Sequence, residues 1–172
     1  MVLLKKLSNE DKNILKEIYD ELEKIYIPTT FQNVGGYGHQ VRTGAVSQRG
    51  ARQTCFGLSF YRGKKRTALY SEKHPHIDIL FKKFINSHNP EFDYDSVYVN
   101  KNVVCKKHID HKNAKSSLIV GIGEYSGGET VLELEEGEKE FDIKNQSLIF
   151  DGSKIPHYNN EFEGLRYSLV FF

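Results

Sequence analysis

The sequence of 172 residues predicts an α+β fold, in which N-terminal helices pack on one face of a jelly-roll core. Two runs of helical periodicity precede residue 90, and from residue 97 onward short strand-like runs follow one another closely. Many short strands after two helices are typical of a closed or double-sheet β core. The chain has the length of one ordinary domain. We therefore expect one domain, with residues 1–96 as a helical and basic support region and residues 97–172 as the β core.

The two predicted helices are marked by their ends and by their apolar faces. Ser8 and Asp11 have the spacing of a capping box, and Pro28 ends the first helix. Its apolar face consists of Leu15, Ile18, Leu22 and Ile25. The second helix begins near Pro75 and ends in the Asn-Ser-His-Asn-Pro segment. Its apolar face consists of Ile77, Leu80, Phe81, Phe84 and Ile85.

A basic, glycine-rich stretch lies between these helices. From Ile25 to Ser71 there is no Asp or Glu, and the stretch holds seven Arg and Lys residues. Its pattern predicts a loop from Gly35 to Arg52, then a strand at residues 54–61 and a turn at residues 62–65. The formal net charge of +1 names no partner, because an acidic segment near the C-terminus offsets this stretch. The loop is either solvated or a binding site for phosphates.

The second half of the sequence consists of short runs rich in β-branched and aromatic residues, separated by turn residues. The predicted strands are residues 97–104, 116–123, 129–135, 140–143, 146–151 and 165–172. Residues 106–117 resemble the start of a strand as well, and they contain the His-Ile-Asp motif.

Strand geometry predicts that His108 and Asp110 project to one face, because side chains at i and i+2 point the same way. His157 follows a predicted strand and can supply a third ligand. Two histidines and one carboxylate with open positions are typical of non-haem Fe(II) oxygenases. A His-X-Asp motif also occurs by chance at protein surfaces. His111 points away from the pair and is expected to be an outer-sphere or surface residue.

Arg166 lies in an apolar predicted strand, where a buried guanidinium is costly without an anionic partner. A carboxylate suits its planar fork, and Ser168 on the same face can add a hydroxyl hydrogen bond. The alternative is a structural salt bridge to an acidic side chain. A cupin-like zinc protein is disfavoured, because Arg166 would then have no purpose.

The order His-Ile-Asp, Pro-His, Arg-Tyr-Ser resembles the HxD…H…RxS order of Fe(II)/2-oxoglutarate dioxygenases, and residues 97–172 resemble their double-stranded β-helix. More narrowly, residues 100–133 are similar to the Tet/JBP branch, including its phage and viral members, which shows HxDxxN, a serine, a strand and a Gly-Gly turn. The matching positions are Asn113, Ser117, Gly123, Gly127 and Gly128. The upstream segment Ala-Arg-Gln-Thr-Cys-Phe-Gly is also similar, less specifically.

This resemblance implies an enzyme that hydroxylates the 5-methyl group of a pyrimidine, 5-methylcytosine or thymine, in nucleic acid. It implies Fe(II) on His108, Asp110 and His157, with dioxygen and 2-oxoglutarate as co-substrates. Arg166, helped by Ser168, would bind the distal carboxylate of 2-oxoglutarate. Asn113 would lie toward the base or co-substrate, and Phe172 where some members stack an aromatic ring on a flipped base.

The basic stretch then has a predicted role. Arg42, Arg49 and Arg52 are candidates for phosphate contacts, with Arg52 also able to reach the co-substrate, and His39 is a candidate for stacking on a base. DNA is favoured over RNA as the partner, and a monomer is expected. Two cysteines without a CxxC motif favour a reducing, intracellular location, cytoplasmic or nuclear. No membrane partner is expected, because no apolar run approaches the length of a membrane span. The Tet/JBP resemblance is compatible with a virus- or phage-encoded protein.

Two other functions stay open at this point. One is a 2-oxoglutarate-dependent hydroxylase of prolyl or lysyl residues in proteins, which would carry the same core motif. The other is a catalytically silent nucleic-acid-binding module with an oxygenase fold.

Overall fold

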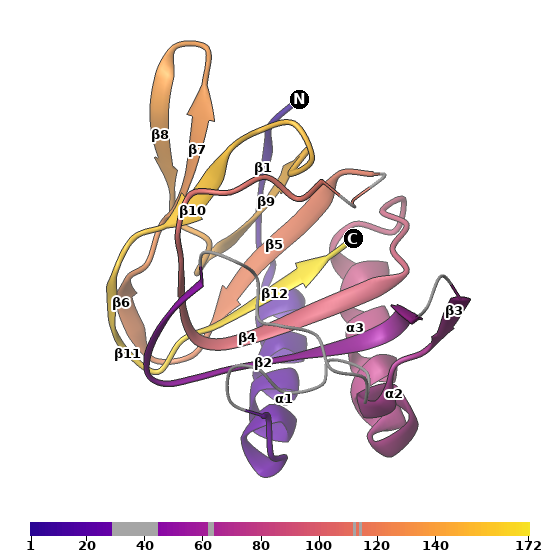
Figure 1. The fold of residues 1–172 in the computed structure, drawn as a ribbon. Coiled ribbons are helices and arrows are strands. Elements are labelled where there is room, and N and C mark those ends of the chain that lie inside the picture. Colours follow the sequence, from indigo (N-terminus) through magenta and orange to yellow (C-terminus); the bar gives the residue numbers. More distant parts are fainter. Residues whose placement is uncertain (29–44, 62–63, 112, 114) are drawn as a thin grey trace.

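The computed structural model describes residues 1–28, 45–61, 64–111, 113 and 115–172. Three helices and twelve strands make up this part of the chain (Figure 1). The helices are α1 (Asn9–Lys24), α2 (Leu69–Lys73) and α3 (Pro75–His88). The strands are β1 (Leu3–Lys6), β2 (Ala45–Tyr61), β3 (Lys64–Thr67), β4 (Ser96–Cys105), β5 (Ser117–Ile122), β6 (Tyr125–Gly127), β7 (Thr130–Leu134), β8 (Gly137–Phe141), β9 (Gln146–Phe150), β10 (His157–Asn159), β11 (Phe162–Gly164) and β12 (Tyr167–Phe171).

The strands form one large sheet and two small ones. The large sheet has the order β1-β9-β5-β12-β4-β2-β3, and the small sheets have the orders β10-β7-β8 and β11-β6. All of the pairings described are antiparallel. A large sheet with helices behind it and smaller sheets in front is the predicted jelly-roll arrangement (Figure 1).

Helices α1 and α3 cover one face of the large sheet (Figure 1). The N-terminus of α1 is fixed by the predicted capping box, because Ser8 and Asp11 exchange side-chain-to-backbone hydrogen bonds. The apolar faces of both helices and every second residue of β4, β5 and β12 form one core. A second, smaller core lies between β9 and the β7–β8 hairpin. The alternation leaves the other side chains of β4, β5 and β12 pointing away from the helices.

The predicted basic loop is wrong in its second half, because residues 45–52 belong to β2. A register shift between Ser47 and Arg52 lets this long strand pair with β4 on both sides of the irregularity. The strand was not predicted, because the glycine and arginine residues of this segment are not typical of strands. Pairing with β4 stabilises the strand despite this composition. Residues 35–44, the first part of the predicted loop, lie outside the described residues.

Several short elements were also not predicted. Strand β1 continues the sheet beyond β9, β3 contains part of the predicted turn after β2, and β6 and β11 replace two further predicted turns. Strands from residues 1–96 and from residues 97–172 thus share one sheet. Within the described part of the chain, no helix combines the length and apolar character needed to cross a membrane.

Candidate functional site

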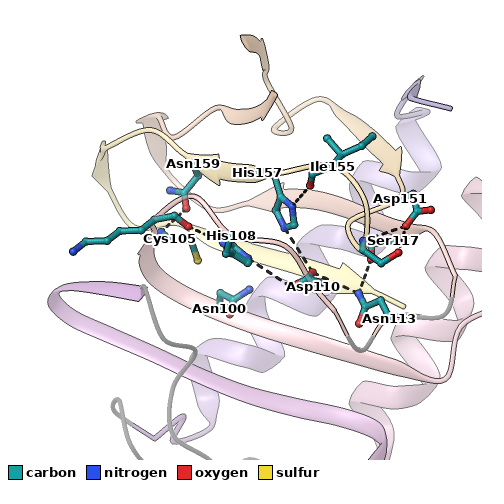
Figure 2. A network of polar contacts seen from close by, with 12 residues as sticks. Asn100, Cys105, His108, Asp110, Asn113, Ser117, Asp151, Ile155, His157 and Asn159 are labelled. Carbon is teal, nitrogen blue, oxygen red and sulfur yellow. Dashed lines mark hydrogen bonds and ion pairs between the residues drawn. The ribbon is translucent and has the colours of Figure 1, made fainter. Parts of the chain in front are cut away.

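His108, Asp110 and His157 converge on the face of the large sheet opposite the helices (Figure 2). Each residue offers a ligand atom within 4.8 Å of the other two. The Nε2 atoms of His108 and His157 lie 3.5 and 3.6 Å from the two carboxylate oxygens of Asp110. Their side chains are 17%, 7% and 10% exposed in chain order, so the group is largely enclosed but reachable. Two imidazoles and a carboxylate can hold a divalent metal on one side.

The predicted strand around His108 and Asp110 is wrong, because β5 begins only at Ser117. His108 instead forms an isolated bridge with His157, in which each backbone N–H donates to the other residue's carbonyl at 3.0 and 2.9 Å. The Asp110 backbone N–H donates to the Gly152 carbonyl at 2.8 Å. Backbone pairing across 49 positions of sequence brings the histidines together, rather than strand alternation.

Both histidines present the same ring nitrogen toward Asp110. The Nδ1 of His108 lies 2.7 Å from the Lys106 carbonyl, and the Nδ1 of His157 lies 2.8 Å from the Ile155 carbonyl (Figure 2). A carbonyl only accepts hydrogen bonds, so each Nδ1 carries the proton and donates it. Each Nε2 therefore keeps its lone pair for a metal, which is the usual tautomer of a metal-binding histidine.

Two residues lie close to the carboxylate of Asp110: Gly152, which has no side chain, and Asn113, which carries an amide. A Cβ at Gly152 would lie 3.3 Å from both Asp110 Oδ2 and His157 Cε1. The Nδ2 of Asn113 donates to Ser117 Oγ at 3.1 Å and lies 3.5 Å from Asp110 Oδ2 (Figure 2). Asn113 thus lies beside the candidate metal ligands. His111 is exposed, as predicted for a residue outside the site.

Arg166 is the second feature of the site. It is 2% exposed, its Nη2 donates to the Gly128 carbonyl at 2.9 Å, and its guanidinium carbon lies 5.5 Å from the ring centres of Tyr125 and Phe162. The backbone of Arg166 exchanges hydrogen bonds with Asn102. Among the described residues, no ion pair joins Arg166 to a carboxylate, and its Nε and the hydroxyl of neighbouring Tyr125 are both buried without a hydrogen bond of normal geometry. Burial lowers the pKa of the guanidinium, because the charged form is desolvated. Tyr125 and the charge of Glu129 nevertheless favour the charged guanidinium.

One pocket connects the metal-binding group with Arg166. It holds about 510 Å³ of empty space, part of which is open to solvent. Its lining comprises Asn100, Cys105, His108, Asp110, Ser117, Ile119, Thr130, Phe150, His157, Tyr158, Asn159, Arg166, Ser168 and Val170. Arg166 lies one residue before β12 rather than inside the strand as predicted. It still shares the pocket face with Ser168 and Val170, as predicted for Arg166 and Ser168. The structural salt bridge considered as the alternative for Arg166 is not found among the residues described.

The sequence analysis missed Asn100 and Thr130, which also line the pocket. Both are polar residues within apolar predicted strands, and both are less than a tenth exposed. The same pattern that singled out Arg166 would have found them, since a buried polar group needs a partner.

The other predicted binding residues lie elsewhere. Arg52 lies on the helix side of the large sheet, where its Nη1 donates to the Ile27 carbonyl at 2.7 Å. Phe172 follows β12 on the pocket side, but its ring packs against Tyr98 at 4.9 Å outside the pocket lining. His39, Arg42 and the side chain of Arg49 lie outside the described residues.

Comparison with known proteins gives a fold but no sequence relative. No protein-family model matches the chain, and no curated protein matches it in sequence. Among solved structures, the chain is similar to an oxidoreductase of the 2OG-Fe(II) oxygenase family from Burkholderia pseudomallei, with a TM-score of 0.64 and 14% identity over 99% of this chain and 84% of that one. This chain has the fold of the 2OG-Fe(II) oxygenases.

Two further structures share this fold. A prolyl-4-hydroxylase from Pseudomonas putida matches with a TM-score of 0.55 and 13% identity, over 99% of this chain and 91% of that one. NgTET1 in complex with 5mC DNA matches with a TM-score of 0.52 and 16% identity, over 70% of this chain and 60% of that one. At such low identity the similarity concerns the fold alone.

Proposed function

We propose that this protein is an Fe(II)/2-oxoglutarate-dependent dioxygenase. The observation that carries the proposal is one pocket with a His-Asp-His ligand set and a buried Arg166 that lacks an anionic partner among the described residues. A buried guanidinium without an anion is unfavourable unless a ligand supplies the negative charge. The fold shared with the 2OG-Fe(II) oxygenases supports the same conclusion.

The residues of the pocket fit this pair of ligands. His108, Asp110 and His157 would hold the iron, and their donor types suit Fe(II). When bound, the iron would supply the chemistry by which dioxygen hydroxylates a C–H bond: one oxygen atom enters the product hydroxyl, and the other enters succinate as 2-oxoglutarate is oxidised with release of carbon dioxide. Arg166, which lines the same pocket, would neutralise the distal carboxylate of 2-oxoglutarate through its guanidinium.

The remaining walls of the pocket have a separate task. Ile119, Phe150 and Val170 present apolar surface to the space between the ligand set and Arg166. Such surface limits the entry of water and strengthens the electrostatic interactions within the pocket. The backbone acceptors of the two Nδ1 protons keep the imidazoles in their ligating orientation.

For the substrate, we propose the 5-methyl group of a pyrimidine in nucleic acid. The support is the Tet/JBP-like order of Asp110, Asn113 and Ser117, the acid-free basic stretch, and the fold shared with NgTET1, which was solved in complex with 5mC DNA. Because a base inside a duplex is inaccessible, such an enzyme must act on a flipped base or a single strand.

A protein hydroxylase is the second candidate, and two observations favour it. The prolyl-4-hydroxylase fold matches a larger share of both chains than NgTET1 does. The β7–β8 hairpin, which pairs with the strand of His157, also exposes five glutamates to solvent: Glu133, Glu135, Glu136, Glu138 and Glu140. Lys107 pairs with Glu133 and Glu138 and offsets part of this charge. The negative charge that remains repels a phosphate backbone and suits a basic peptide. Nucleic acid would have to approach from the other side of the pocket.

One experiment separates these candidates. The protein is incubated with Fe(II), 2-oxoglutarate and ascorbate, and succinate release is measured with methylated oligonucleotides of DNA and RNA and with prolyl and lysyl peptides. Mass spectrometry of the nucleosides and peptides then identifies the hydroxylated product. Hydroxymethylpyrimidine with coupled succinate supports the nucleic-acid proposal, and hydroxylated peptide overturns it in favour of the second candidate. If no succinate forms with any of these substrates, the result would favour the catalytically silent nucleic-acid-binding module.

The basic stretch gives an independent test of the nucleic-acid proposal. If Arg42 and Arg49 contact phosphates, the logarithm of the binding constant should fall with the logarithm of salt concentration at about −0.7 to −0.9 per contact. Changing both residues to Glu should weaken oligonucleotide binding and flatten this slope, while succinate formation without nucleic acid stays unchanged. Salt-independent binding by the parent protein would contradict the proposal.

A further inference from the structure

Three polar side chains form a row across the large sheet, on the pocket face and beside Arg166. Gln53 of β2 lies opposite Asn100 of β4, and Asn100 lies opposite Ser168 of β12. Asn100 is 8% exposed and Ser168 is 5% exposed, and both line the pocket. Figure 2 shows Asn100 below the candidate metal ligands. The row therefore connects β2, at the margin of the pocket, with the floor near Arg166.

The hydrogen bonds within this row have one direction. The Nε2 of Gln53 donates to Asn100 Oδ1 at 2.5 Å, and the Nδ2 of Asn100 donates to Ser168 Oγ at 3.2 Å. The hydroxyl of Ser168 therefore acts as an acceptor toward Asn100, and its own proton is left for another partner. Because cooperative chains of hydrogen bonds polarise one another, this arrangement also strengthens Ser168 as a donor.

A second hydroxyl faces the same space from the opposite wall. Thr130, at the start of β7, lines the pocket, is 3% exposed, and its Oγ1 has no hydrogen-bond partner among the described residues. The Nε of Arg166 is also buried without a hydrogen-bond partner among the described residues. Buried polar atoms are nearly always paired in folded proteins, so the unpaired Thr130 hydroxyl and the guanidinium of Arg166, both from residues that line the pocket, suit a polar ligand.

We infer that Gln53 and Asn100 are positioning residues, which present the Ser168 hydroxyl as a donor to the distal carboxylate bound on Arg166, with Thr130 as a second hydroxyl donor. The inference rests on the proposed function, since it names 2-oxoglutarate as the ligand. A carboxylate accepts about four hydrogen bonds, so the guanidinium and two hydroxyls are compatible donors. The pocket would thereby select 2-oxo acids that end in a carboxylate over those that end in a methyl group.

The test reverses the direction of the hydrogen bonds between residue 53, Asn100 and Ser168. In the variant Gln53→Glu, a carboxylate replaces the donor, so the Asn100 amide should turn its Nδ2 toward residue 53 and its Oδ1 toward Ser168. The Ser168 proton is then drawn to Asn100 and lost to the ligand. The purified full-length chain is loaded with Mn(II), and the dissociation constants of 2-oxoglutarate and of 2-oxopentanoate are measured by calorimetry. The second compound has the same chelating end but a methyl group in place of the distal carboxylate.

We expect Gln53→Glu and Thr130→Val each to weaken 2-oxoglutarate binding by about ten- to a hundredfold, the range for one hydrogen bond to a charged group. Binding of 2-oxopentanoate should change little. The uncharged variant Gln53→Leu should act in the same direction with a smaller effect, and it serves if the glutamate variant does not fold.

Two matched controls come from the same sheet. Gln146→Glu makes the same charge change at a glutamine of β9 outside the pocket lining, where the side chain donates to the Asp142 carbonyl. Thr54→Val removes another buried, unpaired hydroxyl, from a residue that lies opposite Val99 and outside the pocket lining. Both controls should bind 2-oxoglutarate as the parent does.

A double variant separates positioning from a general structural effect. If Gln53 acts through the hydroxyl of Ser168, Gln53→Glu should have no further effect on 2-oxoglutarate binding when Ser168→Ala is already present. Additive losses in the double variant, or parent-like selectivity in the single variants, would overturn the inference while the proposed function stands. A parent protein that binds Mn(II) but no 2-oxoglutarate would overturn both.

Discussion

The substitution Gly128→Ala tests whether the position of the Arg166 guanidinium matters for ligand binding. Gly128 has a φ of +75°, and a Cβ there would lie 2.7 Å from Arg166 Nε and 3.0 Å from its Cδ. Ordinary van der Waals contact of a Cβ begins near 3.4 Å, so Nε would have to retreat by about 0.7 Å. The same movement strains the 2.9 Å hydrogen bond from Nη2 to the Gly128 carbonyl.

The expected magnitude has two parts. Left-handed backbone costs an alanine roughly 1–2 kcal/mol of stability, which lowers Tm by about 2–8 °C for a chain of this size. Displacement of the guanidinium removes a charge-assisted contact with the distal carboxylate, and about ten- to a hundredfold of 2-oxoglutarate affinity should be lost.

Gly137→Ala is the matched control, because its φ is also positive, at +115°, but nothing lies within 4 Å of the added Cβ. It should lower Tm and leave 2-oxoglutarate affinity unchanged. Tm is followed by thermal unfolding without ligand, and affinity by calorimetry with Mn(II). If Gly128→Ala is folded and binds 2-oxoglutarate as tightly as Gly137→Ala does, the guanidinium does not hold the carboxylate where the structure places it.

Three further predictions concern the metal ligand Asp110, the carboxylate-binding residue Arg166 and the buried Asp11 of α1. Asp110→Ala should abolish succinate formation and weaken Mn(II) binding with little change in the circular dichroism spectrum, and full activity in this variant would refute the metal site. Arg166→Ala should raise the apparent KM for 2-oxoglutarate about ten- to a hundredfold, whereas an unchanged KM would make Arg166 structural. Burial raises the pKa of Asp11, but hydrogen bonds from the Ser8 backbone and from α3, including His88, outweigh it, and the net pKa lies below the usual 3.8. A depressed carboxyl pKa adds stability above the unfolded value that is lost as pH falls through the folded one. Asp11→Asn should therefore destabilise the protein at pH 7 and reduce the dependence of Tm on pH below 4, and a parallel pH profile would refute this.

Much of the site could be predicted from residue chemistry and order. His108, Asp110, His157 and Arg166 stand out because imidazole, carboxylate and a guanidinium in an apolar strand each require a partner. The partner of the guanidinium could not be predicted, because an internal salt bridge and an external carboxylate leave the same pattern in the sequence. The structure separates these readings by placing no carboxylate within ion-pairing distance of Arg166 among the described residues.

The sequence by itself determined what depends on neighbouring residues: the capping box of Ser8 and Asp11, the periodic faces of α1 and α3, and the alternation that puts Arg166, just before β12, on the same side as Ser168. These features rest on interactions within a few positions of the chain. Tertiary structure decided what depends on pairing between distant segments. Residues 45–52 became strand because β4 offered hydrogen bonds, and His108 met His157 through a single bridge. The row from Gln53 to Ser168 joins residues 47 and then 68 positions apart, and no local pattern records which strands will lie side by side.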